Sequence, residues 1–541
     1  MTSITLNSVF TVMAIFGAVS SQATASRIIA TGWDSPTPAR FRAELAEFEK
    51  WGCFDGTTIA PTRKLADGRV VDCRRAFSRE HWEWAEFAEA VNDLREAKPT
   101  IATNNFLFVY ANPGDVDWFD DTGWREIVDH WRLVARLARE GGLCGVLYDA
   151  EPYTKPHSQF RYSAQPGAKN HTFADYCVKA RERGQEVMNA VATEFPDITI
   201  MTYRLFCDLL PALDSGDVKA AIEPSVYSLQ PAFVDGWCDV MPDTVRIVEG
   251  DEDAYLFNSE EKFYRAFTRL KLGAPAFVSP ENREKLGKQY YVGHGIYLDA
   301  HVNPPTSRWH IDRLGGTSAQ RLAANVASAL KTSDGFIWIY GEKAKWWPGG
   351  NPDFPMWPEK LQGADEALRR ARDPIGTVQE ILDQAQPEDN VLRNGEFRQL
   401  TANGNPEDWW IWQDERSHGR TTADQEAACL IGVANGVFGQ NITVKPGEGY
   451  GVRCRIRSVG RGFSCLSIGW KTPEGKWTAQ DSRRYFAPIG DTDSNGWREA
   501  LGLVLVPSGA GEMVFMLSIQ GQITEDDRAW FDDCQAMKYE E

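Results

Sequence analysis

Two acidic side chains two positions apart, Asp149 and Glu151, stand at the end of a short apolar segment that begins at Gly145. Strand side chains repeat with a period of two, so both carboxylates should point the same way from the end of a buried parallel strand. In a partly dry cleft the two cannot both ionise freely, and one can keep a proton near neutral pH. This is the general-acid chemistry of glycoside hydrolysis. The alternative is an ordinary strand end whose acids cap a helix or pair with an arginine.

The segments around this pair alternate short apolar runs with helical patterns over roughly 330 residues. The strands predicted from these runs are 28–34, 54–59, 101–110, 144–150, 198–203, 245–249, 290–298 and 335–340. Eight strand–helix units of this kind predict a (β/α)₈ TIM barrel over residues 26–360, with its site at the carboxyl ends of the strands. A doubly wound open sheet is the alternative, although no Gly-rich phosphate loop follows an early strand.

Acids and aromatic residues are unusually frequent just after these strands, and we expect them to line one bowl. The expected substrate-binding residues are Trp33, Asp34, Tyr153, Tyr203, Glu249, Glu252, Tyr255, Tyr297, Asp299, Trp338, Trp346 and Trp347. Glu151 is the expected acid/base, with Asp149 assisting it. The second carboxylate stays open among Glu342, Glu249, Glu252 and Asp299. A separation of about 5–5.5 Å from Glu151 would make it a nucleophile, and about 6.5–9.5 Å a base that activates water.

Composition restricts the classes of partner. The chain has 541 residues, which is too long for a single core, and its 20 Trp and 16 Tyr suit stacking against sugar rings. Its formal net charge of -18 argues against nucleic acid and against an anionic membrane surface as partners. The sequence leaves the oligomeric state open.

Residues 1–25 have the pattern of a secretory signal peptide, with an apolar core from Val9 to Val19 and a small-residue exit at Ala25. The mature protein is therefore expected to be secreted, periplasmic or at the cell surface, and no later run is long enough to span a membrane. Export permits disulfides, and Cys53 with Cys73 is the predicted pair. No Cys or His spacing typical of zinc occurs.

The sequence changes character after the predicted barrel. Residues 361–389 predict a helical linker packed on the barrel, and residues 390–541 alternate short β-prone segments with turns. This second pattern is typical of an antiparallel sandwich.

Three motifs of the sandwich region resemble the jelly-roll carbohydrate-binding modules of the family 4, 9 and 22 type. They are the opening 390–397 (Asn-Val-Leu-Arg-Asn-Gly-Glu-Phe), the midpoint 440–450 and the ending 530–533 (Trp-Phe-Asp-Asp). The resemblance implies a structural calcium ion held by Glu396 and Asp532. It also implies sugar platforms among Trp409, Trp410, Trp412 and Trp470, although about half of the Trp residues of such a sandwich belong to its core.

The barrel region resembles glycoside hydrolases in two ways. The Asp149-x-Glu151 motif is similar to that of family 18, and Trp338 is similar to the Trp that floors the site of that family, but Gly145 and Leu147 replace its two upstream Asp residues. Glu151-Pro152 resembles the Asn-Glu-Pro acid/base of the large retaining clan, with Ala150 in place of Asn. The resemblance implies a diverged bacterial polysaccharide-degrading enzyme that needs no cofactor for catalysis.

Two other classes of protein remain open. In a non-catalytic glycan-binding surface protein, Asp149 and Glu151 would be paired with basic residues. In a polysaccharide lyase, His294 or His301 would serve as a base beside Tyr297. For the hydrolase itself, Lys343 and Lys345 beside Trp346 and Trp347 would read an acidic or sulfated sugar, unless they are simply solvated.

Overall fold

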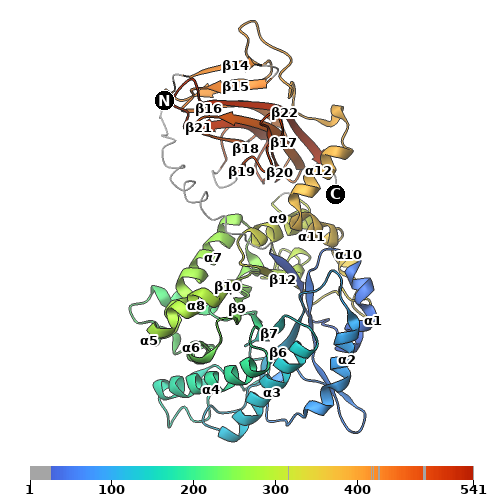
Figure 1. The fold of residues 1–541 in the computed structure, drawn as a ribbon, viewed down its shortest axis with the longest axis vertical. Helices are drawn as coiled ribbons and strands as arrows, with labels where there is room; N and C mark the ends of the chain where they lie inside the picture. Colours follow the sequence, from blue (N-terminus) through green and yellow to red (C-terminus); the bar gives the residue numbers. More distant parts are fainter. Residues whose placement is uncertain are drawn as a thin grey trace. The chain divides into compact units, whose positions relative to one another are not determined.

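The protein is described by a computed structural model that covers residues 26–539 except 315, 416, 418, 425–426 and 479–482. The expected signal peptide lies outside the described residues. The chain forms two compact units. The first contains the residues up to Asp299 together with Ser328–Met356, and the second contains Ala300–Ala327 together with the chain from Trp357 onward (Figure 1).

The first unit is built on a large curled sheet of parallel strands with the form of a half-barrel. In spatial order its strands are β10 (Tyr290–Val292), β9 (Arg246–Glu249), β8 (Thr199–Thr202), β7 (Gly145–Asp149), β6 (Phe106–Pro113), β2 (Gly56–Ile59), β1 (Arg27–Ala30), β12 (Phe336–Tyr340) and β11 (Gly295–Tyr297). β5 (Arg75–Phe77) pairs with the far end of β6. The expected strands are therefore present, and the seventh is divided into β10 and β11.

β10 and β11 stand at the two ends of this order, yet only Gly293 and His294 separate them in sequence. β10 pairs with β9, and β11 pairs with β12. The amide of Gly293 donates to the carbonyl of Glu249 at 2.7 Å, and the amide of Trp338 donates to the carbonyl of His294 at 3.1 Å. One short segment thus bonds to a strand on each side of it.

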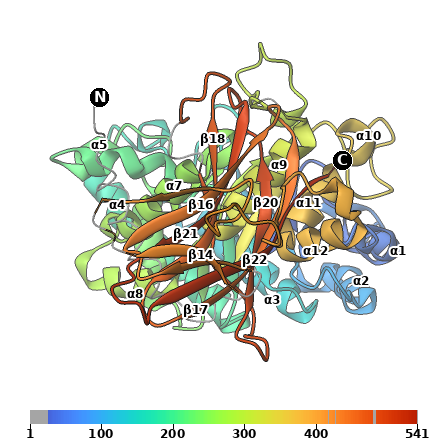
Figure 2. The same ribbon diagram turned by 90° about the horizontal axis from the view of Figure 1, so that it is seen from above.

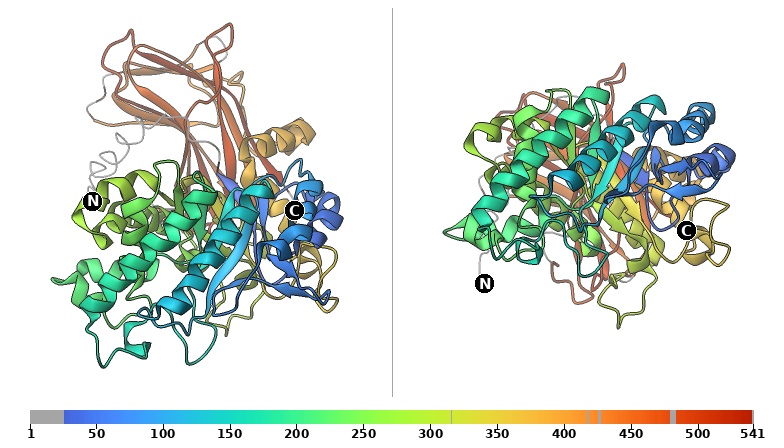
Figure 3. Two further views of the ribbon diagram at one scale, coloured as in Figure 1. Left: turned by 60° about the horizontal axis from the view of Figure 1, so that its bottom comes forward. Right: turned by 90° about the horizontal axis from the view of Figure 1, so that it is seen from below.

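Helices cover the outside of this sheet, because each strand is followed by an amphipathic segment that must bury its apolar face. They are α1 (Pro38–Glu49), α2 (Ala88–Ala97), α3 (Asp121–Glu140), α4 (Phe173–Glu194), α5 (Val218–Ile222), α6 (Gln230–Val240), α7 (Glu260–Gly273) and α8 (Arg283–Gln289). A further helix, α9 (Ser318–Lys331), begins in the second unit and ends in the first. The long helices α3 and α4 lie side by side (Figure 3). The side chain of Asp120 caps α3, and Thr172 caps α4.

A small insertion follows β2. The hairpin of β3 (Thr62–Lys64) and β4 (Val70–Asp72) leads into β5. Cys73 lies at the end of this hairpin, and the structure holds Cys53 and Cys73 as buried thiols, so the predicted disulfide is not formed. Cys73 instead donates to the carbonyl of Val71 at 3.6 Å, and burial raises the pKa of its thiol to about 12.

Two five-stranded antiparallel sheets form most of the second unit (Figure 2). One contains β13 (Trp410–Gln413), β16 (Asn435–Thr443), β21 (Glu512–Gln520), β18 (Phe463–Lys471) and β19 (Arg484–Phe486), in that order. The other contains β14 (Arg420–Asp424), β15 (Ala427–Ile431), β22 (Arg528–Tyr539), β17 (Gly449–Val459) and β20 (Arg498–Leu505). Residues of both sheets share one core, which includes Phe438, Leu466, Val452 and Phe531. This arrangement is a β-sandwich.

Three helices precede the sandwich: α10 (Trp357–Lys360), α11 (Ala364–Arg372) and α12 (Pro374–Gln384). α12, which the sequence predicts to pack on the barrel, buries Val378 and Leu382 against Leu501 and Met537 of the sandwich. This contact attaches α12 to the sandwich through a small apolar cluster of its own, separate from the core between the sheets.

Candidate active site

The strand β7 places Asp149 at the carboxyl edge of the sheet. All five residues of β7 are buried, which is typical of a parallel strand covered on both faces. Gly145 opens the strand with φ +152°, and a Cβ there would lie 2.1 Å from the carbonyl oxygen of Thr199. Only glycine lets β7 approach β8 this closely at that point.

Asn112, near the end of β6, holds the loop that follows β7. Its amide nitrogen donates to the carbonyl of Glu151 at 2.8 Å. Its amide oxygen accepts from the backbone N–H groups of Tyr153 at 2.9 Å and Thr154 at 3.0 Å. These three bonds fix the backbone that carries Glu151 and Tyr153. Sequence patterns do not reveal this role, because it depends on a contact between β6 and the loop after β7.

Asp149 is fully buried and contacts a phenol and a backbone amide. Its Oδ1 accepts the N–H of Glu151 at 2.8 Å, and its Oδ2 lies 2.6 Å from the hydroxyl of Tyr153. Burial, followed by the negative charge of Glu151, raises the pKa of Asp149 to about 8. Asp149 is therefore a carboxyl group that keeps its proton near neutral pH.

Glu151 lies in a more open position, with 31% of its side chain exposed. Its Oε2 lies 2.8 Å from the hydroxyl of Tyr153, and its Oε1 lies 3.8 Å from Nε of Arg204. The hydroxyl of Tyr153 thus contacts both acids, although Tyr153 as a residue is 57% exposed. The two acids share one strand end, as the spacing predicts, but they differ sharply in access to solvent.

Arg204 connects this pair to a third acid. Its guanidinium group lies 3.0 Å from Glu252 and 2.5 Å from Asp208. Burial raises the pKa of Glu252 to about 7, against the charge of Arg204, which lowers it. The side chain of Gln230 holds the loop of Arg204 by donating to the carbonyls of Arg204 at 3.1 Å and Leu205 at 2.9 Å.

Aromatic rings from several strands meet beside these acids. Trp338 is buried, stacks on Tyr203 with ring centroids 4.1 Å apart, and donates from Nε1 to the carbonyl of Gly250 at 2.7 Å. Tyr255 stacks on Tyr297 at 4.9 Å and on Tyr340 at 5.9 Å. These rings bring together the ends of β8, β11 and β12 and the turn after β9.

Glu342 belongs to a separate group of side chains. Its backbone N–H donates to Oδ2 of the buried Asp299 at 2.8 Å. Burial, followed by the charge of Asp299, raises the pKa of Glu342, while hydrogen bonds with Tyr297 and Tyr340 lower it. The expected acids thus form two groups, one around Asp149, Glu151 and Glu252 and one around Asp299 and Glu342.

Several expected site residues have structural contacts of their own. Glu249 is buried and accepts from the N–H groups of Leu205 at 2.9 Å and Phe206 at 2.6 Å and from the hydroxyl of Tyr290 at 3.0 Å. Asp34 forms a two-bond ion pair with Arg40, with both distances 2.8 Å. These carboxylates therefore stabilise a loop and a helix start.

The tryptophans expected to line the bowl also differ in their exposure to solvent. Trp346 and Trp347 are 3% and 2% exposed. Trp347 stacks on Phe48 at 4.2 Å, and Trp346 packs edge-on against Phe54 at 4.9 Å, so both belong to an apolar cluster. Trp33 is 63% exposed, and its side chain forms a hydrogen bond with Tyr340.

The histidines considered for a lyase lie inside the protein. His294 is fully buried, with Nδ1 2.7 Å from Asp251 and Nε2 3.0 Å from the carbonyl of Thr332. Burial lowers the pKa of His301 to about 3. Lys345 donates to the carbonyls of Gly349 and Asn351, each at 2.9 Å. All three side chains are buried.

Tyr227 and Arg74 are two neighbours of the site that sequence patterns do not reveal. The pKa of Tyr227 is raised by burial and then by the charge of Glu151. Arg74 lies 5.9 Å from the ring centres of Phe108 and Tyr110. Neither residue follows a predicted strand, so no periodicity could have indicated it.

The tryptophans of the sandwich follow the expected division between core and surface. Trp409 and Trp470 are 6% and 2% exposed and belong to the core. Trp410 and Trp412 on β13 are 37% and 41% exposed, and Trp477 is 46% exposed. Trp410 donates from Nε1 to Asn441 at 3.0 Å, which places the two side chains on the same face of the sheet.

No family model and no curated protein matches this chain. Solved structures do resemble parts of it. A carbohydrate-binding module of family 4 aligns with 27% of this chain and 99% of its own, at 18% identity and a TM-score of 0.21.

Two enzymes are also among the structural neighbours. The Clostridium thermocellum endo-1,4-β-D-xylanase 10B, as its CBM22-1 and GH10 modules, aligns with 28% of this chain and 29% of its own, at 10% identity and a TM-score of 0.20. The α-L-arabinofuranosidase MgGH51 aligns with 28% of this chain and 26% of its own, at 17% identity and a TM-score of 0.22. This chain therefore matches less than a third of either enzyme.

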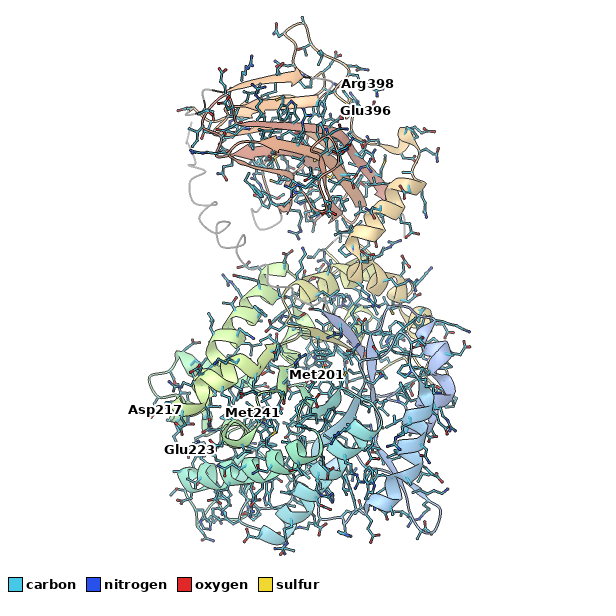
Figure 4. All side chains as sticks on the ribbon, viewed as in Figure 1. Met201, Asp217, Glu223, Met241, Glu396 and Arg398 are labelled. Carbon is cyan, nitrogen blue, oxygen red and sulfur yellow. The ribbon has the colours of Figure 1, made fainter. Side chains whose placement is uncertain are left out.

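Glu396 and Asp532 lie at the start and the end of the sandwich. Glu396 forms an ion pair with Arg398 at 2.9 Å (Figure 4). The pKa of Asp532 is raised by burial and by the charges of Asp533 and Glu396, so these carboxylates lie near one another. Within the described residues, no group of three or more His, Cys, Asp or Glu side chains is arranged to hold a metal ion.

None of the described helices is long and apolar enough to cross a membrane.

Proposed function

We propose that this chain is a secreted glycoside hydrolase that acts on a polysaccharide or complex glycan, with Glu151 as the general acid/base. The observation that supports this role is the contact of one phenol, Tyr153, with a buried acid and a partly exposed acid at the same strand end. A glycosidase needs a carboxyl that is protonated near neutral pH and a site for the sugar beside it. The exposed ring of Tyr153 supplies a surface on which a sugar can stack.

We further propose that the curled sheet closes into a (β/α)₈ barrel. The segment from Tyr290 to Tyr297 supports this proposal, because its first half pairs with β9 and its second half pairs with β12. Counting β10 and β11 as one strand then gives the eight strands of such a barrel. In this arrangement Asp149, Arg204 and Glu252 all lie at its carboxyl end.

Glu252 is the favoured second carboxylate. Arg204 contacts both Glu252 and Glu151, whereas Glu249 is already bonded to three donors and Asp299 accepts a backbone N–H group. Glu342 is the alternative, from the neighbouring group of side chains. Glu252→Gln is expected to reduce hydrolysis more than Glu342→Gln, and the opposite ranking would assign the role to Glu342.

A glycan panel tests the reaction itself. Hydrolysis releases new reducing ends without unsaturated products, a lyase produces unsaturated absorbance, and a binding protein retains glycan without cleaving it. We expect the first result. A glycan that is bound but left intact would favour the non-catalytic alternative, and the ion pair of Glu151 with Arg204 is the observation in its favour.

Replacement of Glu151 tests its role in hydrolysis. Glu151→Gln is expected to keep glycan binding and lower kcat by about 10²–10⁴, because a positioned general acid contributes about that factor. The loss should shrink on substrates with an activated leaving group. Glu223→Gln is the matched control, since Glu223 lies at the outer edge of the first unit near Asp217 (Figure 4). Full turnover of a natural glycan by Glu151→Gln would contradict the assignment.

We also propose that the sandwich is a carbohydrate-binding module with a structural calcium ion at Glu396 and Asp532. Carboxylate oxygens suit Ca²⁺, and the mutual charge that raises the pKa of Asp532 would be relieved by a cation. Calcium is therefore expected to raise the melting temperature of the protein, and chelator to lower it. Glu396→Gln should abolish this shift, and Glu388→Gln should keep it. No effect of chelator on the unmodified protein would contradict the calcium site.

A further inference from the structure

We propose that Tyr153 joins Asp149 and Glu151 into a single acid and passes a proton from the buried carboxyl to the exposed one. This inference rests on the proposed function and deepens it. Tyr153 acts through Glu151, so it is a positioning residue for the reaction. Its side chain stands between the two acids, because both of its carboxyl contacts are made by the same hydroxyl oxygen.

The proposal depends on the number of protons shared by Asp149, Tyr153 and Glu151. The hydroxyl of Tyr153 lies 2.6 Å from Oδ2 of Asp149 and 2.8 Å from Oε2 of Glu151, which are both hydrogen-bond distances. A phenol has a single proton to donate, and an ionised carboxylate can only accept. Both contacts can be hydrogen bonds only if one of the two carboxyls is protonated and donates to the phenol oxygen. The bridge therefore requires one proton shared by the two acids.

The other contacts of Asp149 identify the oxygen that carries this proton. Oδ1 of Asp149 accepts the N–H of Glu151 at 2.8 Å, which leaves Oδ2, the atom facing Tyr153, for the proton. Asp149 is also 0% exposed, whereas Glu151 is the acid that reaches the open side. Burial favours the neutral form of a carboxyl, so the resting proton belongs on Asp149. The raised pKa of Asp149 agrees with this placement.

Transfer needs two short proton movements and no other reactant. The Oδ2–H bond of Asp149 breaks as its proton binds the hydroxyl oxygen of Tyr153, while the original phenol proton moves to Oε2 of Glu151. The negative charge passes from Glu151 to Asp149, and the phenol is neutral before and after. Glu151 then carries the proton that it donates to the leaving-group oxygen of the substrate.

The surrounding charges affect this equilibrium. Glu252 and Glu151 raise the pKa of Asp149, and Arg204 faces both Glu151 at 3.8 Å and Glu252 at 3.0 Å. Asp208 pairs with Arg204, and Arg74 lies beside Tyr110. The phenols of Tyr148, Tyr203, Tyr227 and Tyr340 are also close, and their pKa values are raised in part by the charge of Asp149. These phenols stay neutral near pH 7, so the shared proton is the one that moves.

Infrared spectroscopy of the intact protein without ligand tests the shared proton directly. Among the C=O stretches of protonated carboxyls at pH 7, to which Glu249 and Glu252 also contribute, we expect one component that is lost in Asp149→Asn and shifts in Tyr153→Phe. Tyr162→Phe is the matched control, because its hydroxyl bonds the carbonyls of Ala168 and His171 in the same connection between β7 and α4. Identical protonated-carboxyl bands in the unmodified protein and in Asp149→Asn at pH 7 would overturn the proposal.

The pH profile of kcat/KM tests the transfer, on whichever glycan of the panel gives reducing ends. Tyr153→Phe should move the basic limb of the profile to lower pH, because Glu151 can no longer draw on the proton of Asp149. The deficit should shrink with an activated leaving group. A uniform loss at every pH would assign Tyr153 a merely structural role and overturn the relay. If the infrared band is present and no glycan is cleaved, the proton-sharing bridge is supported and the hydrolase function fails instead.

Discussion

Asp149 and Glu151 look equivalent in the sequence, but burial makes their carboxyl groups chemically different. Asp149 is 0% exposed, and burial raises its pKa from 3.8 to about 8; burial also raises the pKa of Glu249 from 4.5 to about 7. Between about pH 4 and about pH 8 these two carboxyls therefore hold protons in the folded protein that they have released in the unfolded chain. Their contribution to the free energy of unfolding falls as the pH rises through this range.

This dependence on pH can be measured by denaturant unfolding between pH 5 and pH 8. Asp149→Asn removes one of the titrating groups, so we expect its stability to fall less steeply with pH than that of the unmodified protein. Asp243→Asn, at an exposed position, should leave the slope unchanged. Identical slopes for Asp149→Asn and the unmodified protein would show that Asp149 is already ionised in the folded state at pH 5.

For single residues, the sequence predicts the site where the residues involved are close together in the chain. The spacing of Asp149 and Glu151 along one strand is enough to place both at its end, and Tyr153 follows two residues later. Arg204 approaches Glu151 only because β7 and β8 are neighbours in the sheet. Trp346 and Trp347 look like platforms beside a strand end, but their environment is an apolar cluster. Burial of a particular ring depends on distant packing that periodicity does not encode.

Among the elements, the segment from Tyr290 to Tyr297 is the most constrained. A Cβ on Gly293 would lie 2.4 Å from the carbonyl oxygen of Phe336 and 3.4 Å from that of Glu249. Gly293→Ala must therefore displace the backbone of β12 or break a bond to β9. We expect a loss of roughly 1–3 kcal/mol in the free energy of unfolding.

A second glycine in the preceding helix gives a matched control for this prediction. Gly287 lies in α8, and the nearest atom to an added Cβ is 4.0 Å away. Gly287→Ala should be neutral or should stabilise by up to about 1 kcal/mol, because alanine favours the helix. Thermal unfolding of both variants measures the difference in stability. A Gly293→Ala protein as stable as Gly287→Ala would show that the backbone between β10 and β11 tolerates a side chain at Gly293.

Apolar runs were sufficient to predict the parallel strands. They were not sufficient for β3 and β4, whose six residues include Arg63, Lys64 and Asp72 and form a short hairpin at the surface. The division of the seventh strand also escapes prediction. Its residues read as one apolar run, and only their two different partners show that the run changes neighbours at Gly293.

For the whole molecule, the extent of the second unit determines which fragments should fold. Val378 and Leu382 of α12 are 0% and 9% exposed where they contact Leu501 and Met537. A fragment that starts at residue 373 should therefore be more stable than one that starts at residue 388, by about 2 kcal/mol or more, since each buried side chain contributes about that much. Thermal unfolding of the two fragments, with Val378→Ala in the longer one as an intermediate case, measures the difference. Equal melting temperatures would show that α12 adds nothing to the sandwich.

The pairing of β1 with β12 has a consequence for biosynthesis. Arg27 lies beside Phe336 and Ala30 beside Ile339, so the earliest strand of the sheet takes a partner made about three hundred residues later. During translation one edge of β1, with its apolar Ile28 and Ile29, has no strand to bond until β12 leaves the ribosome. Contacts this distant in sequence form slowly, and an unpaired edge can bind other chains meanwhile. A ribosome-bound chaperone that shields the first strand would therefore matter more for this protein than for one whose first strand pairs only with nearby segments.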